Sequence, residues 1–218
     1  MPSMVSVLTG DLVGSTQVAP ELVDKAMRIL ADAAENVGNW TMTDTKFTRF
    51  RGDGWQMLVA QPDLGLRAAV YLIACLRSRK SLLSTRIAIG TGTVANIGTH
   101  DLSDASGDAF TLSGRALDAM PRLATIAVAK KAIRPLHLGY ITLVEDVIQA
   151  WTPEQAEATS YYLHPDAPKM DDIAKNLGIS IQAVSQRLGG ANGQDLRQAL
   201  RYWEMDHALE QPGERQNP

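Results

Sequence analysis

The sequence predicts an α+β domain followed by an all-α region, and two observations carry that prediction. In residues 4–128, apolar runs of strand length and stretches of helical periodicity follow one another in the order β-α-β-β-α-β, before a further helix and strand. This is the order of a split βαβ, or ferredoxin-like, unit, which forms one mostly antiparallel sheet, and we expect its helices on one face. After about residue 144, only helical patterns follow.

Local signals support the individual elements. Gly10 and Asp11 stop the first strand pattern, Pro20 suits the first turn of a helix, and the glycines at 52 and 54 suit a tight hairpin turn. The expected elements are a strand at 4–9, a helix from residue 20, strands at 45–50 and 55–60, a helix after residue 62, a strand at 85–91, a helix at 107–120 and a strand at 124–128. They are followed by a helical stretch at 145–163, two short helices within 170–188 and a last helix at 192–209.

Composition narrows the class of protein. The 218 residues are 45% hydrophobic and 21% charged, which allows a core and excludes wholesale disorder. A net charge of −3 excludes a polybasic nucleic-acid binder, although a locally basic face remains compatible. The single cysteine, Cys75, excludes an internal disulfide, and its apolar surroundings predict a buried, unreactive thiol. Without a signal-peptide pattern or a run of about 18 apolar residues, we expect a cytoplasmic protein with no membrane partner.

Two aspartates at predicted strand ends form the first candidate site. Asp11 ends the first strand, and Asp53 lies in the hairpin turn. Because the first strand and the hairpin are central neighbours in a split βαβ sheet, the two carboxylates can hold one or two hard divalent cations, Mg²⁺ or Mn²⁺. The turn at Val13–Thr16 offers backbone N–H groups to a phosphate. Either aspartate alone would be an ordinary turn residue, so the pairing is what indicates a site.

Four segments, in this order, resemble the catalytic domain of the class III nucleotidyl cyclases. They are VLTGDLVGST (7–16), RFRGDGWQMLVA (49–60), RIAIGTGTV (86–94) and DASGDAFTLSGRAL (104–117). The resemblance extends over residues 4 to about 128. A closer resemblance is to the SatD-like bacterial proteins, which share a GD-[IL]-[VN]-x-S start, a GDxxQ hairpin, an IGxGxV strand and a C-terminal helix-turn-helix.

The resemblance to the cyclases implies a role for each matching residue. Asp11 and Asp53 would hold the metal ions, assisted by the carbonyl group of Leu12. The residues that would cradle the phosphates of a nucleoside triphosphate are Val13, Gly14, Ser15 and Thr16.

The resemblance also implies residues that contact the nucleotide. Arg49 stands at the position of the base-selecting lysine, and Asp104 at that of its partner aspartate. Thr111 stands where the family has a ribose-orienting asparagine, and Arg115 where it has the transition-state arginine. Because Arg49 and Thr111 differ in chemistry from the family's residues, the base and the turnover are left open.

Each of these positions also has a structural alternative. Arg115 could form an ion pair with Asp108 or Asp118 on its own helix, and Asp104 could belong to a solvated loop. In class III cyclases the active site lies between two head-to-tail subunits. The resemblance therefore implies a homodimer.

A second motif lies in the C-terminal region. The segment DIAKNLGISIQAVSQRL (172–188) predicts two short helices joined by a left-handed turn at Gly178, with Ser180 capping the second helix. It resembles the helix-turn-helix of sigma-factor region 4 and of many bacterial regulators. Residues 168–209 contain equal numbers of basic and acidic residues, so a monomer would bind double-stranded DNA weakly. The residues expected to be exposed toward DNA are Gln182, Ser185, Gln186 and Arg187.

Taken together, the sequence predicts a cyclase-like domain at 1–143, a helical region at 144–209 and a flexible tail at 210–218. The leading hypothesis is a DNA-binding regulator whose first domain binds a nucleotide, as a triphosphate or a cyclic nucleotide, with metal and dimerises. The alternative is an active enzyme that converts a nucleoside triphosphate to a cyclic nucleotide and pyrophosphate. A third hypothesis is a structural dimerisation domain with a vestigial metal site. The alternative for the helical motif is a packing or protein-interaction unit.

Overall fold

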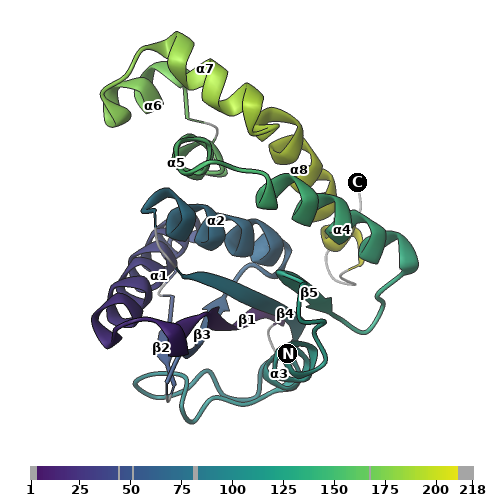
Figure 1. Cartoon of the computed structure of the whole chain (residues 1–218). Helices are drawn as coiled ribbons and strands as arrows, with labels where there is room; N and C mark the ends of the chain where they lie inside the picture. Colours follow the sequence, from purple (N-terminus) through teal and green to yellow (C-terminus); the bar gives the residue numbers. More distant parts are fainter. Residues whose placement is uncertain (1–3, 44, 51, 81–82, 167, 211–218) are drawn as a thin grey trace.

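The computed structural model describes residues 4–43, 45–50, 52–80, 83–166 and 168–210 of the chain. They form a mixed five-stranded sheet with helices on both faces and a further helical layer against one side, which confirms the α+β class (Figure 1). The strands are β1 (Met4–Val13), β2 (Phe47–Arg49), β3 (Gly54–Val59), β4 (Ser84–Thr93) and β5 (Ile126–Ala129).

Strand β1 lies at the centre of the sheet, in the order β2-β3-β1-β4-β5. It runs antiparallel to both β3 and β4, β2 pairs antiparallel with β3, and β5 pairs parallel with β4. Leu8 and Leu12 belong to the core on one side of the sheet, whereas Val5 and Val7 belong to the core on the other. A strand buried on both faces needs a nearly continuous apolar run, and this is what the sequence of β1 supplies.

Helices lie on both faces of the sheet. Helices α1 (Pro20–Thr41) and α2 (Gly65–Ser78), the two helices of the expected split βαβ unit, share the core on one face with Leu8, whereas the further helix α3 (Asp108–Asp118) contributes Ala109 to the core on the other face, beside Val5 and Val7. Gly90 lets α3 lie close to β4, because a Cβ there would collide with the backbone of α3 at Ala109 and Ser113. The helices are α1 (Pro20–Thr41), α2 (Gly65–Ser78), α3 (Asp108–Asp118), α4 (Pro135–Gln149), α5 (Pro153–Tyr162), α6 (Met170–Leu177), α7 (Ile181–Gly190) and α8 (Gly193–Glu210), with short 3₁₀ turns at Ser15–Gln17 and Pro62–Leu64.

The C-terminal helices share one core with the sheet domain. Residues from α4, α5 and α8 pack in the same buried cluster as α1 and α2. Arg67 of α2 is 1% exposed, and its guanidinium donates to both carboxylate oxygens of Glu204 on α8, at 2.6 and 3.0 Å. The same guanidinium donates to the carbonyl oxygen of Leu163 at 3.0 Å. The boundary predicted at residues 143 and 144 falls inside the single helix α4.

Helices α6 and α7 meet at the turn that the sequence predicts. Gly178 has a φ of 64°, and the hydroxyl of Ser180 accepts a hydrogen bond from the N–H of Ala183 at 3.1 Å. Ile173 of α6 and Val184 of α7 pack with Ala158 of α5 in a small separate core. In Figure 1 this helical pair lies at the far end of the helical layer from α4.

Two further expectations concern the ends of the chain and the membrane. Helix α8 extends to Glu210, and residues 211–218 of the predicted tail lie outside the described residues. Within the described residues, no helix combines the length and the apolar character needed to cross a bilayer.

Replacing Glu204 should reveal how strongly the two regions are joined. In Glu204→Gln the buried Arg67 cation loses its counter-charge, and we expect the free energy of unfolding to fall by about 3 kcal/mol. Urea unfolding followed by circular dichroism measures this loss. The matched control is Glu154→Gln at the exposed Lys80–Glu154 pair, which should cost less than about 1 kcal/mol. Equal losses in both variants would contradict a stabilising role for the buried pair.

Candidate functional site

Strand pairing brings the two predicted metal-binding aspartates to one end of the sheet. Asp11 of β1 is paired with Gly54 of β3, the residue that follows Asp53. The backbone N–H of Leu12 also donates to the carbonyl oxygen of Asp53 at 3.2 Å. Asp11, Leu12 and Asp53, which the sequence predicts as one group, therefore lie together.

A buried network holds the backbone at Asp11. The indole N–H of Trp55 donates to the hydroxyl of Thr85 at 3.1 Å, and that hydroxyl donates to the carbonyl oxygen of Asp11 at 2.8 Å. The Trp55 ring lies against Gly10, where a Cβ would overlap it. Gly10 is thus required by packing, and it lets the large Trp55 side chain brace the strand end.

The structure adds a residue that the sequence analysis missed, Arg86 at the start of β4. Its guanidinium forms a two-pronged ion pair with the Asp11 carboxylate, with Nε 3.0 Å from Oδ1 and Nη2 bonded to Oδ2. The hydrogen bond with Asp11 raises the pKa of Arg86, and the Asp53 charge acts in the same direction. Arg86 lies directly opposite Asp11 in the β1–β4 register. Knowledge of this strand register would have identified Arg86 as the residue opposite Asp11.

The predicted phosphate turn follows β1 directly. Gly14 adopts the left-handed conformation (φ 84°), and Ser15 begins a short 3₁₀ turn, so that N–H groups at its start have no partner within the turn. The Ser15 hydroxyl donates a hydrogen bond to the Asp53 carboxylate. Val13 and Thr16 are exposed beside it. Carboxylate, hydroxyl and carbonyl oxygens are the ligands that Mg²⁺ and Mn²⁺ prefer, so the residues present fit such an ion.

A cavity of about 590 Å³ adjoins this end of the sheet. Val13 and Arg86 line it, together with the cationic side chains of Arg77, Lys80 and Arg122. Among the described residues, its lining contains no Asp or Glu. Arg86 is paired with Asp11, and Lys80 is paired with Glu154, so a negatively charged group in the cavity would replace these carboxylates as their partners.

The predicted base-contacting residues are held in other interactions. Arg49 pairs with Asp24 of α1 at 2.7 Å and donates to the carbonyl oxygen of Gly52 at 3.1 Å. Asp104 is exposed and accepts hydrogen bonds from the N–H and the hydroxyl of Thr99, at 3.0 and 2.8 Å. Both hydrogen bonds lower the pKa of Asp104, and the bond from the Thr99 hydroxyl has the larger effect. Asp104 is thus in an exposed loop, as the structural alternative expected.

Thr111 and Arg115 both lie on α3, which runs back along β4. Thr111 donates to the carbonyl oxygen of Gly107 near the start of the helix, at the end of the sheet farthest from Asp11. Arg115 is exposed and forms no ion pair with any described residue, so the predicted pairing with neighbouring aspartates is not observed. Among the described residues, no hydrogen bond or ion pair joins Asp104, Thr111 or Arg115 to Asp11 or Asp53.

On α7, three of the four predicted DNA-contacting side chains are exposed. Gln182, Ser185 and Gln186 face solvent. Arg187 corrects the expectation of exposure, because its side chain is only 25% exposed and pairs with Glu157 of α5 at 2.9 Å. The helical repeat turns position 187 partly toward α5. The sequence pattern of α7 alone does not show this contact, so the prediction of an exposed Arg187 was wrong.

No protein-family model matches the chain, and no curated protein matches it. Solved structures of low similarity include a bacterial light-regulated adenylyl cyclase, at 16% identity and a TM-score of 0.43 over 59% of this chain and 43% of that one. The adenylyl cyclase CyaB from P. aeruginosa is 20% identical, with a TM-score of 0.42 over 67% and 83% of the two chains. The GGEEF domain of a diguanylate cyclase from Vibrio cholerae is 15% identical, with a TM-score of 0.39 over 60% and 85%. The chain thus matches less than half the length of the light-regulated cyclase.

Removing the Thr85 hydroxyl should loosen the strand end that carries Asp11. In Thr85→Val, the buried indole N–H of Trp55 loses its acceptor, and we expect a loss of about 1–3 kcal/mol in the free energy of unfolding. Denaturant titration measures it. Thr85→Ser keeps the hydroxyl and should retain most of the stability; if serine were as destabilising as valine, the hydroxyl network would not be the cause.

Proposed function

We propose that the sheet domain binds a nucleoside triphosphate with divalent metal ions at Asp11 and Asp53. The observation that carries this proposal is that strand pairing brings the backbones of Asp11 and Asp53 together, with the Ser15 hydroxyl bonded to the Asp53 carboxylate beside the 3₁₀ turn. The adjoining cationic cavity suits the charge of a triphosphate. The resemblance of the four sequence segments to class III cyclases supports the same site.

The chain's own groups have distinct roles in this proposal. Asp11 and Asp53, with the Leu12 carbonyl, would hold Mg²⁺ or Mn²⁺, which would neutralise phosphate charge and activate an attacking hydroxyl. Asp11 would exchange its Arg86 partner for the ion, leaving the guanidinium free for a phosphate oxygen. Val13, Gly14, Ser15 and Thr16 would offer backbone N–H groups to the phosphates.

The chemistry we propose to test is cyclisation of the bound nucleotide. The 3′ oxygen forms a bond to the α-phosphorus, the bond from that phosphorus to the β-phosphate oxygen breaks, and pyrophosphate leaves while the hydroxyl proton passes to solvent. Within the described part of the chain, no hydrogen bond or ion pair joins Asp104, Thr111 or Arg115 to Asp11 or Asp53. We therefore propose a homodimer in which a second chain supplies them.

Product analysis tests this function directly. With Mn²⁺ and each of the four ribonucleoside triphosphates, we expect a cyclic product for one base, and we expect Asp11→Ala and Asp53→Ala to reduce its formation by at least about a hundredfold. Mass spectrometry identifies the product. Asp195→Ala, an exposed carboxylate on α8, is the control and should be unaffected. No product from any nucleotide, with no Mn²⁺-dependent nucleotide binding in calorimetry, would contradict the proposal.

We propose the finer fold assignments on similar grounds. The order β2-β3-β1-β4 with three antiparallel pairs is what a split βαβ unit would give, and β5 extends it. The short segments that resemble those of SatD-like proteins support a relation to that group.

DNA binding is the second candidate function, favoured by the α6–α7 arrangement. A left-handed glycine turn, a serine cap and an independent small core are the features of a helix-turn-helix. Gln182, Ser185 and Gln186 would contact base edges and phosphates, and Arg187 would join them only after leaving Glu157. A cytoplasmic protein would meet both chromosomal DNA and nucleoside triphosphates.

A charge placed on α7 tests this second candidate. Gln186→Glu would bring a carboxylate toward phosphates, and we expect its affinity for duplexes selected by the protein from a random library to fall at least about fivefold. Fluorescence polarisation measures the affinity. Gln198→Glu, exposed on α8, is the matched control. Selection of no duplex, or equal losses in both variants, would argue against a role for α7.

A further inference from the structure

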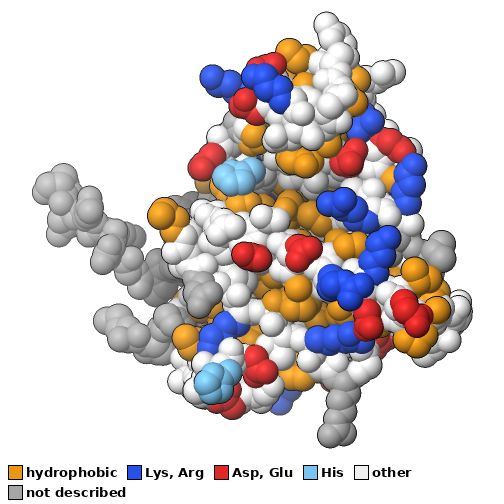
Figure 2. All heavy atoms as spheres, turned by 90° about the vertical axis from the view of Figure 1, so that its left-hand side faces the viewer, with side chains coloured by type: hydrophobic (Ala, Val, Ile, Leu, Met, Phe, Trp, Pro, Cys, Tyr) orange, Lys and Arg blue, Asp and Glu red, His pale blue; other side chains and the backbone are white. Residues whose placement is uncertain are grey.

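A second cavity lies between α1, α2 and α5, and its lining includes Ser78 and Arg79 at the end of α2. Its volume is about 770 Å³, within the range of small-molecule sites. We call it the α1–α2–α5 groove. Figure 2 shows the side of the molecule that carries this groove, where Lys and Arg side chains gather along one edge of a hollowed surface and a histidine lies toward the other. The lining of this groove and that of the cavity beside Arg86 share no residue.

One end of the groove is aromatic. The Trp40 ring lies 4.7 Å from that of Tyr71 and 5.8 Å from that of His164, measured between centroids. The amides of Asn36 and Asn39 line the same stretch of α1. Flat rings and adjacent amides suit a heteroaromatic ring that stacks and exchanges hydrogen bonds along its edge.

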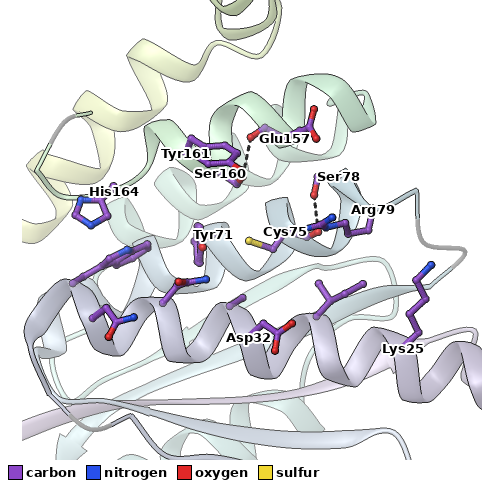
Figure 3. Close-up of a pocket in the computed structure, with 15 residues that line it drawn as sticks. Lys25, Asp32, Tyr71, Cys75, Ser78, Arg79, Glu157, Ser160, Tyr161 and His164 are labelled. Carbon is purple, nitrogen blue, oxygen red and sulfur yellow. Dashed lines mark hydrogen bonds between the residues drawn. The ribbon is translucent and has the colours of Figure 1, made fainter. Parts of the chain in front are cut away.

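The opposite end of the groove is cationic. Figure 3 shows Lys25 and Arg79 at the end away from His164, with Ser78 next to them. Neither cation forms an ion pair with a described residue. At 1.5 Å per residue, Tyr71 and Arg79 are about 12 Å apart along α2, so one small ligand can reach from the Tyr71 ring to the cations. Trp40 and Lys25 are about 22 Å apart along α1, so Trp40 lies beyond the reach of that ligand and packs behind Tyr71.

The stretch between the two ends is lined by two protonated side chains and by the carboxylate of Asp32. Burial raises the pKa of Cys75 to about 12 and raises that of the neighbouring Tyr71 as well, so both are protonated near neutral pH. Cys75 is half-buried and lines the groove, whereas its sequence surroundings predicted full burial. Of the two acidic residues in the lining, Glu157 is neutralised by Arg187, and Asp32 alone opposes the two cations.

We propose that the α1–α2–α5 groove binds a nucleoside phosphate, with its base against Tyr71, which Trp40 supports from behind, and its phosphate against Lys25 and Arg79. A planar ring joined to an anion over this length is the ligand that both ends fit. The site needs no metal, because two cationic side chains supply the charge. It does not depend on the nucleotide site at Asp11 and Asp53.

Calorimetry in EDTA tests the groove, with AMP, GMP, cyclic AMP and cyclic GMP as probes. We expect one of them to bind, and both Lys25→Glu and Arg79→Glu to weaken it by about tenfold or more. Arg28→Glu, an exposed cation on α1 outside the groove, is the matched control and should bind as the wild type does. Asp53→Ala should also leave this binding unchanged.

Two results would overturn the proposal. One is the absence of binding for all four probes. The other is binding that survives Arg79→Glu but is lost in Asp53→Ala, which would place the ligand at the aspartates. Failure of the proposed cyclase chemistry would look different, because metal-dependent product would be missing while metal-free binding at the groove persisted.

Discussion

The burial of β1 between two neighbouring strands and two helical layers is the constraint on which the rest of the structure depends. Both faces of this strand are covered, so its apolar residues serve two cores at once. Asp11 is the one charged residue among the described residues of this strand; its side chain is partly exposed, whereas the next residue, Leu12, is buried in the core again. Trp55 and Thr85 fix this end of the strand from the neighbouring strands. The position of the candidate site is therefore a consequence of how the sheet is packed.

Two ion pairs of the structure differ in how far they are exposed to water. At the sheet end, Asp11 and Arg86 satisfy each other in a partly exposed position, where ion exchange costs little. Between the sheet domain and α8, Arg67 and Glu204 are withdrawn from water and can be separated only at a large cost. The first pair suits a place where ligands come and go, and the second suits a permanent junction.

Local sequence patterns predicted much of the fold, because each strand or helix depends mainly on its own periodicity. The cap at Ser180, the turn at Gly178 and the meeting of Asp11 with Asp53 all follow from such patterns. The side of the sheet that α3 covers depends on contact with Gly90, which lies far from it in sequence, and no local pattern encodes it. The partners of Arg86 and Arg187 are likewise distant in sequence. The positive charge of an arginine does not by itself indicate which acidic residue is its partner.

The junction between Arg67, Leu163 and Glu204 has a mechanical consequence. Because α5 and α8 share a core with α2, the helical layer turns with the sheet as one piece. In two chains that paired through their sheets, each α7 helix would then keep a fixed position relative to its own sheet. The distance between the two α7 helices would be set by the geometry of the pairing, and it would change only if the pairing itself changed.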